Sequence, residues 1–111
     1  MNPFVVPEKI YISTKARDMR AGINTLVAYV EAALQKEPCD GSLYVFLSRD
    51  HKRLKMLRYD GGTWCMWTLM PTEGMFRFRH ESDEIPSVEV DRASLVMLLS
   101  GVDPSTAIYA R

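Results

Sequence analysis

Residues 42–70 read SLYVFLSRDHKRLKMLRYDGGTWCMWTLM, three apolar segments separated by two polar turns. Residues 42–48 and 54–59 alternate in side-chain character, as strands with two different faces do. The DGG sequence at residues 60–62 is a strong hairpin signal, because glycine accepts the positive φ that a tight turn demands. Residues 63–70 are apolar on both faces, which predicts a central strand covered on both sides. The stretch therefore predicts three consecutive antiparallel strands.

Shorter segments on either side also read as strands and turns. Residues 9–13 alternate between isoleucine and tyrosine, which predicts a short strand. After a turn at residues 71–74, residues 75–80 set two phenylalanines against two arginines, which predicts a strand with one solvated, basic face. An acidic loop at residues 81–86 and a last short strand at residues 88–90 are predicted next.

One long amphipathic helix is predicted over residues 18–36. The apolar stripe at helical spacing consists of Met19, Ile23, Leu26, Val27, Val30 and Leu34. Asp18 is expected to cap the first turn, where free amides favour a carboxylate. Gly22 costs about 1 kcal/mol relative to alanine inside a helix, which suggests close packing against a strand. Pro38 and the Asp-Gly turn at residues 40–41 end the helix.

A second, shorter helix is expected near the end of the chain, capped by Asp91 and closed by Gly101. The whole pattern predicts an α+β fold. An antiparallel β-meander of about five strands carries the long helix packed on it, followed by the short C-terminal helix. The chain is expected to form a single domain over residues 1–111, with an ordered core over about residues 9–103 and a loosely held tail at residues 104–111.

The composition is that of an ordinary globular domain, with 47% hydrophobic and 25% charged residues. No apolar run is long enough to cross a membrane, and the start of the chain lacks the apolar core of a secretory signal. We therefore expect a cytoplasmic protein without membrane contact. Its two cysteines, Cys39 and Cys65, are expected to be reduced and not bonded to each other.

The formal net charge is +0, but the charges are segregated along the chain. Residues 49–58 carry five bases and one acid, a net charge of +4, whereas residues 81–91 carry five acids and no base, a net charge of −5. The bases at the predicted hairpin tip and along the next strand are Arg49, Lys52, Arg53, Lys55 and Arg58.

These bases are the candidate DNA-binding residues, because a basic hairpin can grip phosphates and neighbouring aromatic side chains can stack on bases. The aromatic and basic neighbours in the predicted sheet are Tyr44, Tyr59, Trp64, Trp67, Arg77 and Arg79. In the alternative interpretation the charges only solvate the turn and the aromatic side chains fill the core. Both interpretations stay open at this point.

The sequence offers no pattern typical of catalysis or metal binding. Cys39, Cys65, His51 and His80 do not lie at a metal-ligand spacing. The acidic residues fall mostly in predicted turns, and no nucleophile motif or phosphate-binding glycine loop is present. We therefore expect neither an enzyme nor a cofactor, a metal site or a small-molecule substrate.

Residues 9–26 read KIYISTKARDMRAGINTL, which resembles the start of the accessory protein, often called TnpB, of the insertion sequence sixty-six family of bacterial transposable elements. That family shows a short strand followed by D-M-R-x-G and an amphipathic helix. A later frame, G-x-x-x-V-F through an aromatic residue and D-G, fits residues 41–61, and L-x-x-L-L-x-G-[IV]-D fits residues 95–103. The matching signature residues are Asp18, Arg20, Gly22, Asp60 and Gly61.

The resemblance implies a small non-catalytic protein, encoded beside a separate transposase, that assists transposition by binding element DNA or the transposase. Two departures are visible: Leu69 and Met70 stand where the family usually carries Lys-Arg, and this chain is neutral where typical members are basic. Two hypotheses follow. The first is weak, non-specific DNA contact through the hairpin at residues 49–58. The second is an adaptor that binds the transposase without touching DNA. The signature pair Asp18 and Arg20 is expected to be structural.

Overall fold

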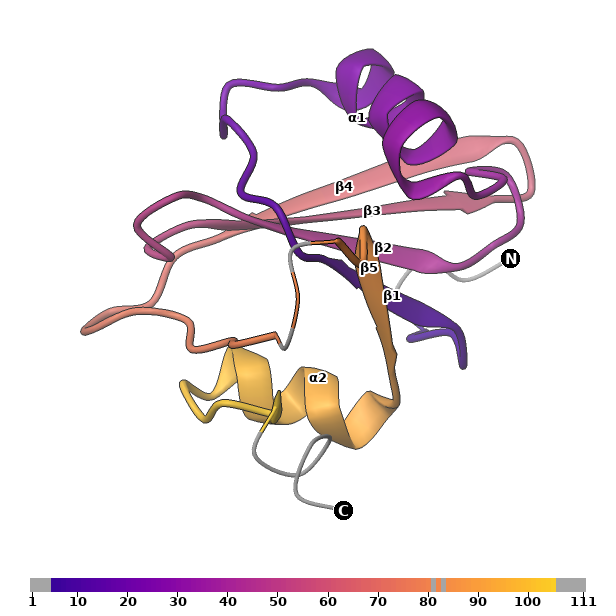
Figure 1. Ribbon diagram of the computed structural model, residues 1–111. Helices are drawn as coiled ribbons and strands as arrows, with labels where there is room; N and C mark the ends of the chain where they lie inside the picture. Colours follow the sequence, from indigo (N-terminus) through magenta and orange to yellow (C-terminus); the bar gives the residue numbers. More distant parts are fainter. Residues whose placement is uncertain (1–4, 81, 83, 106–111) are drawn as a thin grey trace.

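The computed structural model describes residues 5–80, 82 and 84–105. Figure 1 shows one β-sheet with a helix on each face. The elements in chain order are β1 (Ile10–Ser13), α1 (Ile23–Tyr29), its π-helical continuation η1 (Val30–Leu34), β2 (Leu43–Leu47), β3 (Leu54–Asp60), β4 (Thr63–Leu69), β5 (Ser87–Val90) and α2 (Arg92–Leu99). The predicted α+β class is confirmed.

The five strands lie in the order β4-β3-β2-β1-β5. Strands β2, β3 and β4 form the predicted antiparallel meander, and β5 is antiparallel to β1. Strand β1, however, pairs with β2 in the parallel sense, with Ile10 opposite Leu43. The sheet is therefore mixed and not wholly antiparallel. The helix between β1 and β2 forms the crossover connection that two parallel neighbours require.

The helix α1 and its continuation cover one face of the sheet (Figure 1). Leu26, Val30 and Leu34 meet side chains of the three central strands. The sheet residues of this core are Tyr11, Tyr44, Phe46 and Leu57. The opposite face packs against α2 through Leu95 and Leu98. Alternate residues of β2 thus enter different cores, as the alternation in the sequence predicts.

The predicted helix over residues 18–36 is shorter in the structure. It begins at Ile23 after an extended Gly22 and ends at Leu34, where Gln35 adopts a left-handed conformation. Asp18 therefore does not cap it, and the expected cap is wrong. The close packing expected at Gly22 is also wrong, because a Cβ placed there meets no atom within 4 Å.

The predicted strand at residues 75–80 does not form. Phe76 and Phe78 are buried in the α2-side core, as their alternation suggests. The Phe76 amide donates to the His51 carbonyl oxygen over 2.8 Å, which attaches the segment to a loop. Alternation reports which side chains are buried, whereas a strand also needs a neighbouring strand edge, and this segment has none among the described residues.

The prediction that residues 63–70 form a central strand is wrong. Strand β4 lies at the edge of the sheet, and the central strand is β2, all of whose residues are buried. Large side chains such as Trp64 and Trp67 extend the two cores at the rim, one on each face. These side chains make the sequence of β4 apolar on both faces, although the strand itself is only half-buried.

The end of the described chain follows the prediction more closely. The Asp91 carboxylate accepts a hydrogen bond from the Ser94 amide over 2.8 Å and caps α2, and Gly101 has a φ of 83° after the helix. Pro104 and Ser105, the first residues of the tail expected to be loosely held, are instead buried, and residues 106–111 lie outside the described residues. Within the described chain, no helix has the length and apolar character needed to cross a membrane.

Candidate nucleic-acid interface

Three loops meet at one end of the sheet. The loops at residues 14–22 and 48–53 follow the parallel strands β1 and β2, and the loop at residues 70–74 follows β4, which ends beside the start of β3. They enclose an open basin of about 1220 Å³, called the basic basin below. Its charged lining residues are Arg17, Asp18, Arg20, Arg49, Asp50, Lys52, Arg53 and Glu73.

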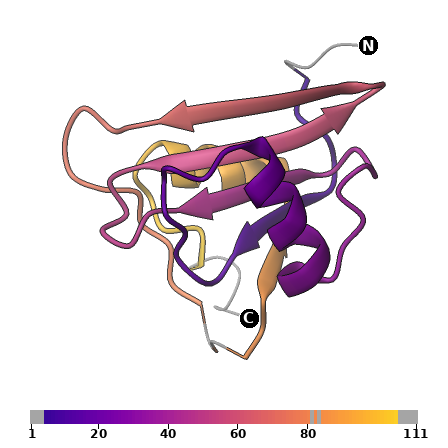
Figure 2. The same cartoon turned by 90° about the horizontal axis from the view of Figure 1, so that it is seen from above.

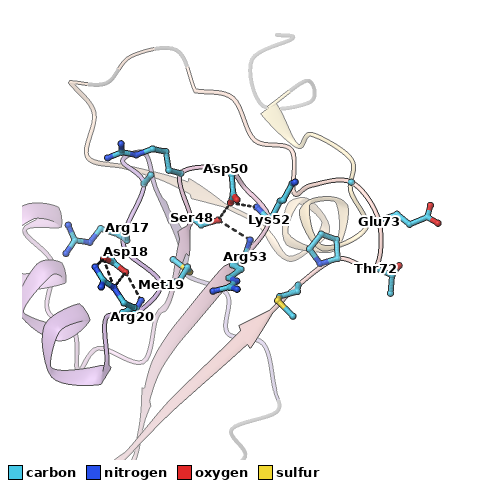
Figure 3. Close-up of a pocket in the computed structure, with 15 residues that line it drawn as sticks. Arg17, Asp18, Met19, Arg20, Ser48, Asp50, Lys52, Arg53, Thr72 and Glu73 are labelled. Carbon is cyan, nitrogen blue, oxygen red and sulfur yellow. Dashed lines mark hydrogen bonds and ion pairs between the residues drawn. The ribbon is translucent and has the colours of Figure 1, made fainter.

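The loop at residues 48–53 is held by its own hydrogen bonds (Figure 3). The Asp50 carboxylate accepts from the Ser48 hydroxyl over 2.8 Å and from the Lys52 amide over 3.0 Å. The Arg53 amide donates to the Ser48 Oγ over 3.0 Å. The Lys52 amide, with the Ser48 hydroxyl, holds the pKa of Asp50 below its ordinary value. This carboxylate is therefore ionised and engaged by its own loop.

The loop presents Arg49, Lys52 and Arg53 to solvent. Within the part of the chain that the structure describes, none of their side-chain cations has a carboxylate or carbonyl partner. His51 turns inward instead, with its Nδ1 3.1 Å from the Phe76 carbonyl oxygen. The turn is thereby anchored while its three cations remain available to a ligand.

Asp18 and Arg20 form a close ion pair at the rim of the basic basin (Figure 3). The Arg20 Nη2 lies 2.6 Å and its Nε 3.1 Å from Asp18 Oδ2, and the Arg20 amide lies 2.8 Å from Oδ1. The Arg20 side chain and amide lower the pKa of Asp18 to about 2. The pair offsets both charges and joins two residues of the loop before α1, and the structural role expected of these signature residues stays a prediction.

Arg17 is a basin residue that sequence reasoning missed. Its amide donates to the Leu47 carbonyl oxygen over 2.9 Å, and its guanidinium carbon lies 4.0 Å from the centre of the Tyr29 ring. Nε is buried without a hydrogen-bond partner among the described residues. Because Arg17 lies far in sequence from residues 49–58, no local charge cluster marks it, and the parallel pairing of β1 and β2 brings it to the basin.

Lys55 and Arg58, the other two predicted DNA-binding residues, do not line the basic basin. The buried Lys55 ammonium donates to the Ala21 carbonyl oxygen over 2.7 Å. On the other face of β3, Arg58 donates to the carbonyl oxygens of Gly41 over 3.2 Å and Val5 over 2.7 Å. Both cations are engaged by the fold, so the structure brings together three of the five predicted residues.

The remaining signature residues, Gly22, Asp60 and Gly61, do not line the basic basin. Gly61 and Gly62 have φ values of 54° and 96°, as a tight two-residue turn between β3 and β4 requires. This turn lies at the opposite end of the hairpin from the basin, beside Asp60. Gly22 is exposed at the start of α1. Of the two glycine signature residues, Gly61 has a positive φ that the turn requires, whereas Gly22 has a φ of −89° that other residues also adopt.

The predicted acidic segment has several separate roles. Glu89 lies 3.6 Å from the Lys9 ammonium, Asp91 caps α2, and Glu84 is exposed. Glu81 and Asp83 lie outside the described residues. The acidic run thus does not act as one surface among the residues that are described.

The aromatic side chains proposed to stack on bases pack mainly in the protein. Tyr44 is buried, and Trp64 packs edge-on against Tyr59 with 4.9 Å between ring centres. Cys39 is exposed and Cys65 is half-buried, and both thiols are free in the structure. Over residues 5–80, 82 and 84–105, no group of three or more His, Cys, Asp or Glu side chains could hold a metal ion.

Comparison with known proteins gives one family and two curated relatives. The family model described as IS66 Orf2 like protein matches residues 8–108. Uncharacterized protein y4hO of Sinorhizobium fredii (strain NBRC 101917 / NGR234) is 36% identical over 95 residues, covering 86% of this chain and 81% of the relative. Uncharacterized protein y4jC of the same strain is 32% identical over 95 residues, covering 86% and 80%. No solved structure matches the chain.

Proposed function

The chain belongs to the IS66 Orf2-like protein family, and from that membership we propose that it assists transposition of an insertion sequence without catalysing the reaction. The family suggests a transposition accessory protein. The proposal adds that the protein works in the cytoplasm and contacts element DNA through the basic basin. This contact is weak and largely independent of DNA sequence.

The observation that carries the DNA proposal is the set of unpartnered cations on one anchored turn. Arg49, Lys52 and Arg53 project from a loop whose acid, Asp50, is already engaged by backbone and hydroxyl donors. Arginine and lysine side chains in this setting suit phosphate oxygens, which position a protein on DNA without reading its bases. The anchored backbone lowers the ordering cost of binding.

The same geometry limits the affinity. Arg20 is paired with Asp18, Arg17 packs on Tyr29, and the remaining basin cations are the three on the turn. About two to three phosphate contacts then correspond to a slope of roughly −2 to −3 in the logarithm of affinity against the logarithm of salt concentration. Binding should therefore weaken only moderately with added salt.

An adaptor that binds the transposase is the second candidate. Met70 lines the basic basin and is 66% exposed, and Met75, which follows the loop at residues 70–74, is 38% exposed. Flexible methionine side chains at a surface suit contact with another protein. In this alternative the basin rim binds the transposase, and DNA is held by the transposase alone.

An electrophoretic shift assay with element-end DNA across a salt series tests the DNA proposal. The variant Arg49→Ala/Lys52→Ala/Arg53→Ala is expected to lose most binding, at least roughly tenfold, and to keep its fold. The matched control, Lys9→Ala/Lys36→Ala/Arg92→Ala, removes the same charge at the opposite end of the sheet and should bind almost normally. Equal losses in both variants would show that only net charge matters.

A pull-down with the transposase separates the second candidate. If the wild-type protein shifts no DNA even at low salt, the DNA proposal fails. The adaptor then predicts that Met70→Asp/Met75→Asp loses the transposase while the triple basin variant retains it. Retention of the transposase by the folded Met70→Asp/Met75→Asp variant would contradict the adaptor, and circular dichroism verifies folding of each variant.

A further inference from the structure

At one edge of the sheet, no described strand pairs with the outer side of the last strand. Strand β4, Thr63–Leu69, pairs with β3 on one side and has no strand on the other among the described residues. Figure 2 shows β4 along one margin of the molecule, with both helices set inward of it. Within the described part of the chain, the outer backbone groups of this strand thus have no strand partner.

The β4 edge lacks the features by which proteins usually block strand pairing. It contains no charged residue and no proline, and its register with β3 runs without a bulge from Thr63 to Leu69. The other edge differs: β5 has four residues, and its Glu89 forms an ion pair with Lys9. Only one of the two edges is thus suited to pairing.

The turn between β3 and β4 determines which backbone groups face outward. A two-residue turn with positive φ at Gly61 and Gly62 closes on a hydrogen-bonded pair, here Asp60 and Thr63. Bonding alternates along an antiparallel ladder. The amide and carbonyl groups of Trp64, Met66 and Thr68 consequently point away from β3.

We infer that β4 pairs with β4 of a second copy of this chain, antiparallel and about a two-fold axis beside Met66. Met66 then lies opposite its own copy, and Trp64 lies opposite the partner subunit's Thr68. The outward groups of these residues form about six backbone hydrogen bonds across the axis. The two sheets join into one continuous sheet.

The side chains of β4 favour a second copy as the occupant, because the strand complements itself. Antiparallel pairing at this register places the large Trp64 opposite a small threonine, and the large Trp67 opposite a small cysteine, on opposite faces of the sheet. All residues of the strand are uncharged, so no like charges meet at the axis. A two-fold contact of this kind closes on itself and forms a dimer instead of a filament.

Analytical ultracentrifugation and amide hydrogen exchange by NMR test the inference on the intact protein. From micromolar to near-millimolar concentration we expect a monomer–dimer equilibrium. The amides of Trp64, Met66 and Thr68 should exchange roughly tenfold more slowly at the high end, while amides already bonded within the sheet should change little. A wild-type protein that stays monomeric, or a dimer in which these amides exchange freely, would overturn the inference.

A proline substitution provides the matched comparison. Thr68→Pro removes one outward N–H that the monomer does not use, so it should weaken dimerisation at least roughly tenfold, whereas Thr68→Ala should still dimerise. If Thr68→Pro does not fold, Met66→Lys replaces it, because two ammonium groups would meet at the axis. Unchanged dimerisation in a folded edge variant would contradict the inference, whatever the protein does with DNA.

Discussion

The ammonium group of Lys55 donates a hydrogen bond to the carbonyl oxygen of Ala21 over 2.7 Å. Lys55 is 7% exposed, and Ala21 lies just before α1. The bond therefore ties β3 to the approach of the helix that covers the sheet. A lysine that belongs to a basic cluster in the sequence is a structural residue in the fold.

Replacing Lys55 by Ala should lower the free energy of unfolding by about 1–3 kcal/mol, because a partly buried carbonyl group loses its partner. Lys52→Ala, on the exposed loop just before β3, should change the free energy of unfolding by no more than about 0.5 kcal/mol. Urea denaturation of the two variants measures the difference. Equal effects would show that the Lys55 bond does not contribute to stability.

Val30→Asp should prevent folding, since Val30 is fully buried between the helix and the sheet and the new charge would have no partner. Ala28→Asp places the same charge on the exposed side of α1 and should leave the protein folded. Circular dichroism and thermal melting compare the two. A folded Val30→Asp protein with an unchanged melting temperature would mean that this face is not in the core.

The Asp18 carboxyl group should titrate with a pKa of about 2, below its ordinary value of 3.8, because Arg20 donates to it. A lowered pKa in the folded state stabilises the protein above about pH 4, and this contribution is lost as the pH falls from about 4 to about 2. Carboxyl carbon shifts measured by NMR give the midpoint. In Arg20→Gln the midpoint should rise toward 3.8, and an unchanged midpoint would contradict the role of the pair.

Gln35→Gly should stabilise the protein by about 0.5–1 kcal/mol. Gln35 has a φ of 55° and a ψ of 44° at the end of the helix, a conformation that glycine adopts without the steric cost of a Cβ. Gln35→Ala keeps the Cβ and should give no such gain. Thermal melting compares the two variants. If Gln35→Ala stabilised the protein as much as Gln35→Gly, the left-handed conformation of Gln35 would not be the cause of the gain.

Much of the local structure could be predicted from residue patterns. The alternation in residues 43–47 correctly assigns Tyr44 and Phe46 to one core and their neighbours to the other. Asp91 caps a helix because its side chain accepts a hydrogen bond from the helix backbone. Gly61 forms a turn because glycine adopts a positive φ. These features depend on residues close together in the chain, so a local pattern is sufficient.

The direction and position of the strands could not be predicted in this way. The pairing of β1 with β2 is parallel because the helix between them crosses the sheet, and β4 is an edge strand although it is apolar on both faces. Hydrophobic periodicity records which side chains avoid water. Hydrophobic periodicity contains no information on which strand pairs with which.

The candidate site shows the same division. The sequence by itself determined that a strongly basic turn follows β2 and that its tip carries Arg49, Lys52 and Arg53. Only the tertiary structure decided that these three remain without partners in the described chain while Lys55 is buried against Ala21. It also decided that Arg17 joins them across the sheet. The physical reason is that a charge is a property of one residue, whereas its neutralisation depends on groups that folding brings from distant parts of the chain.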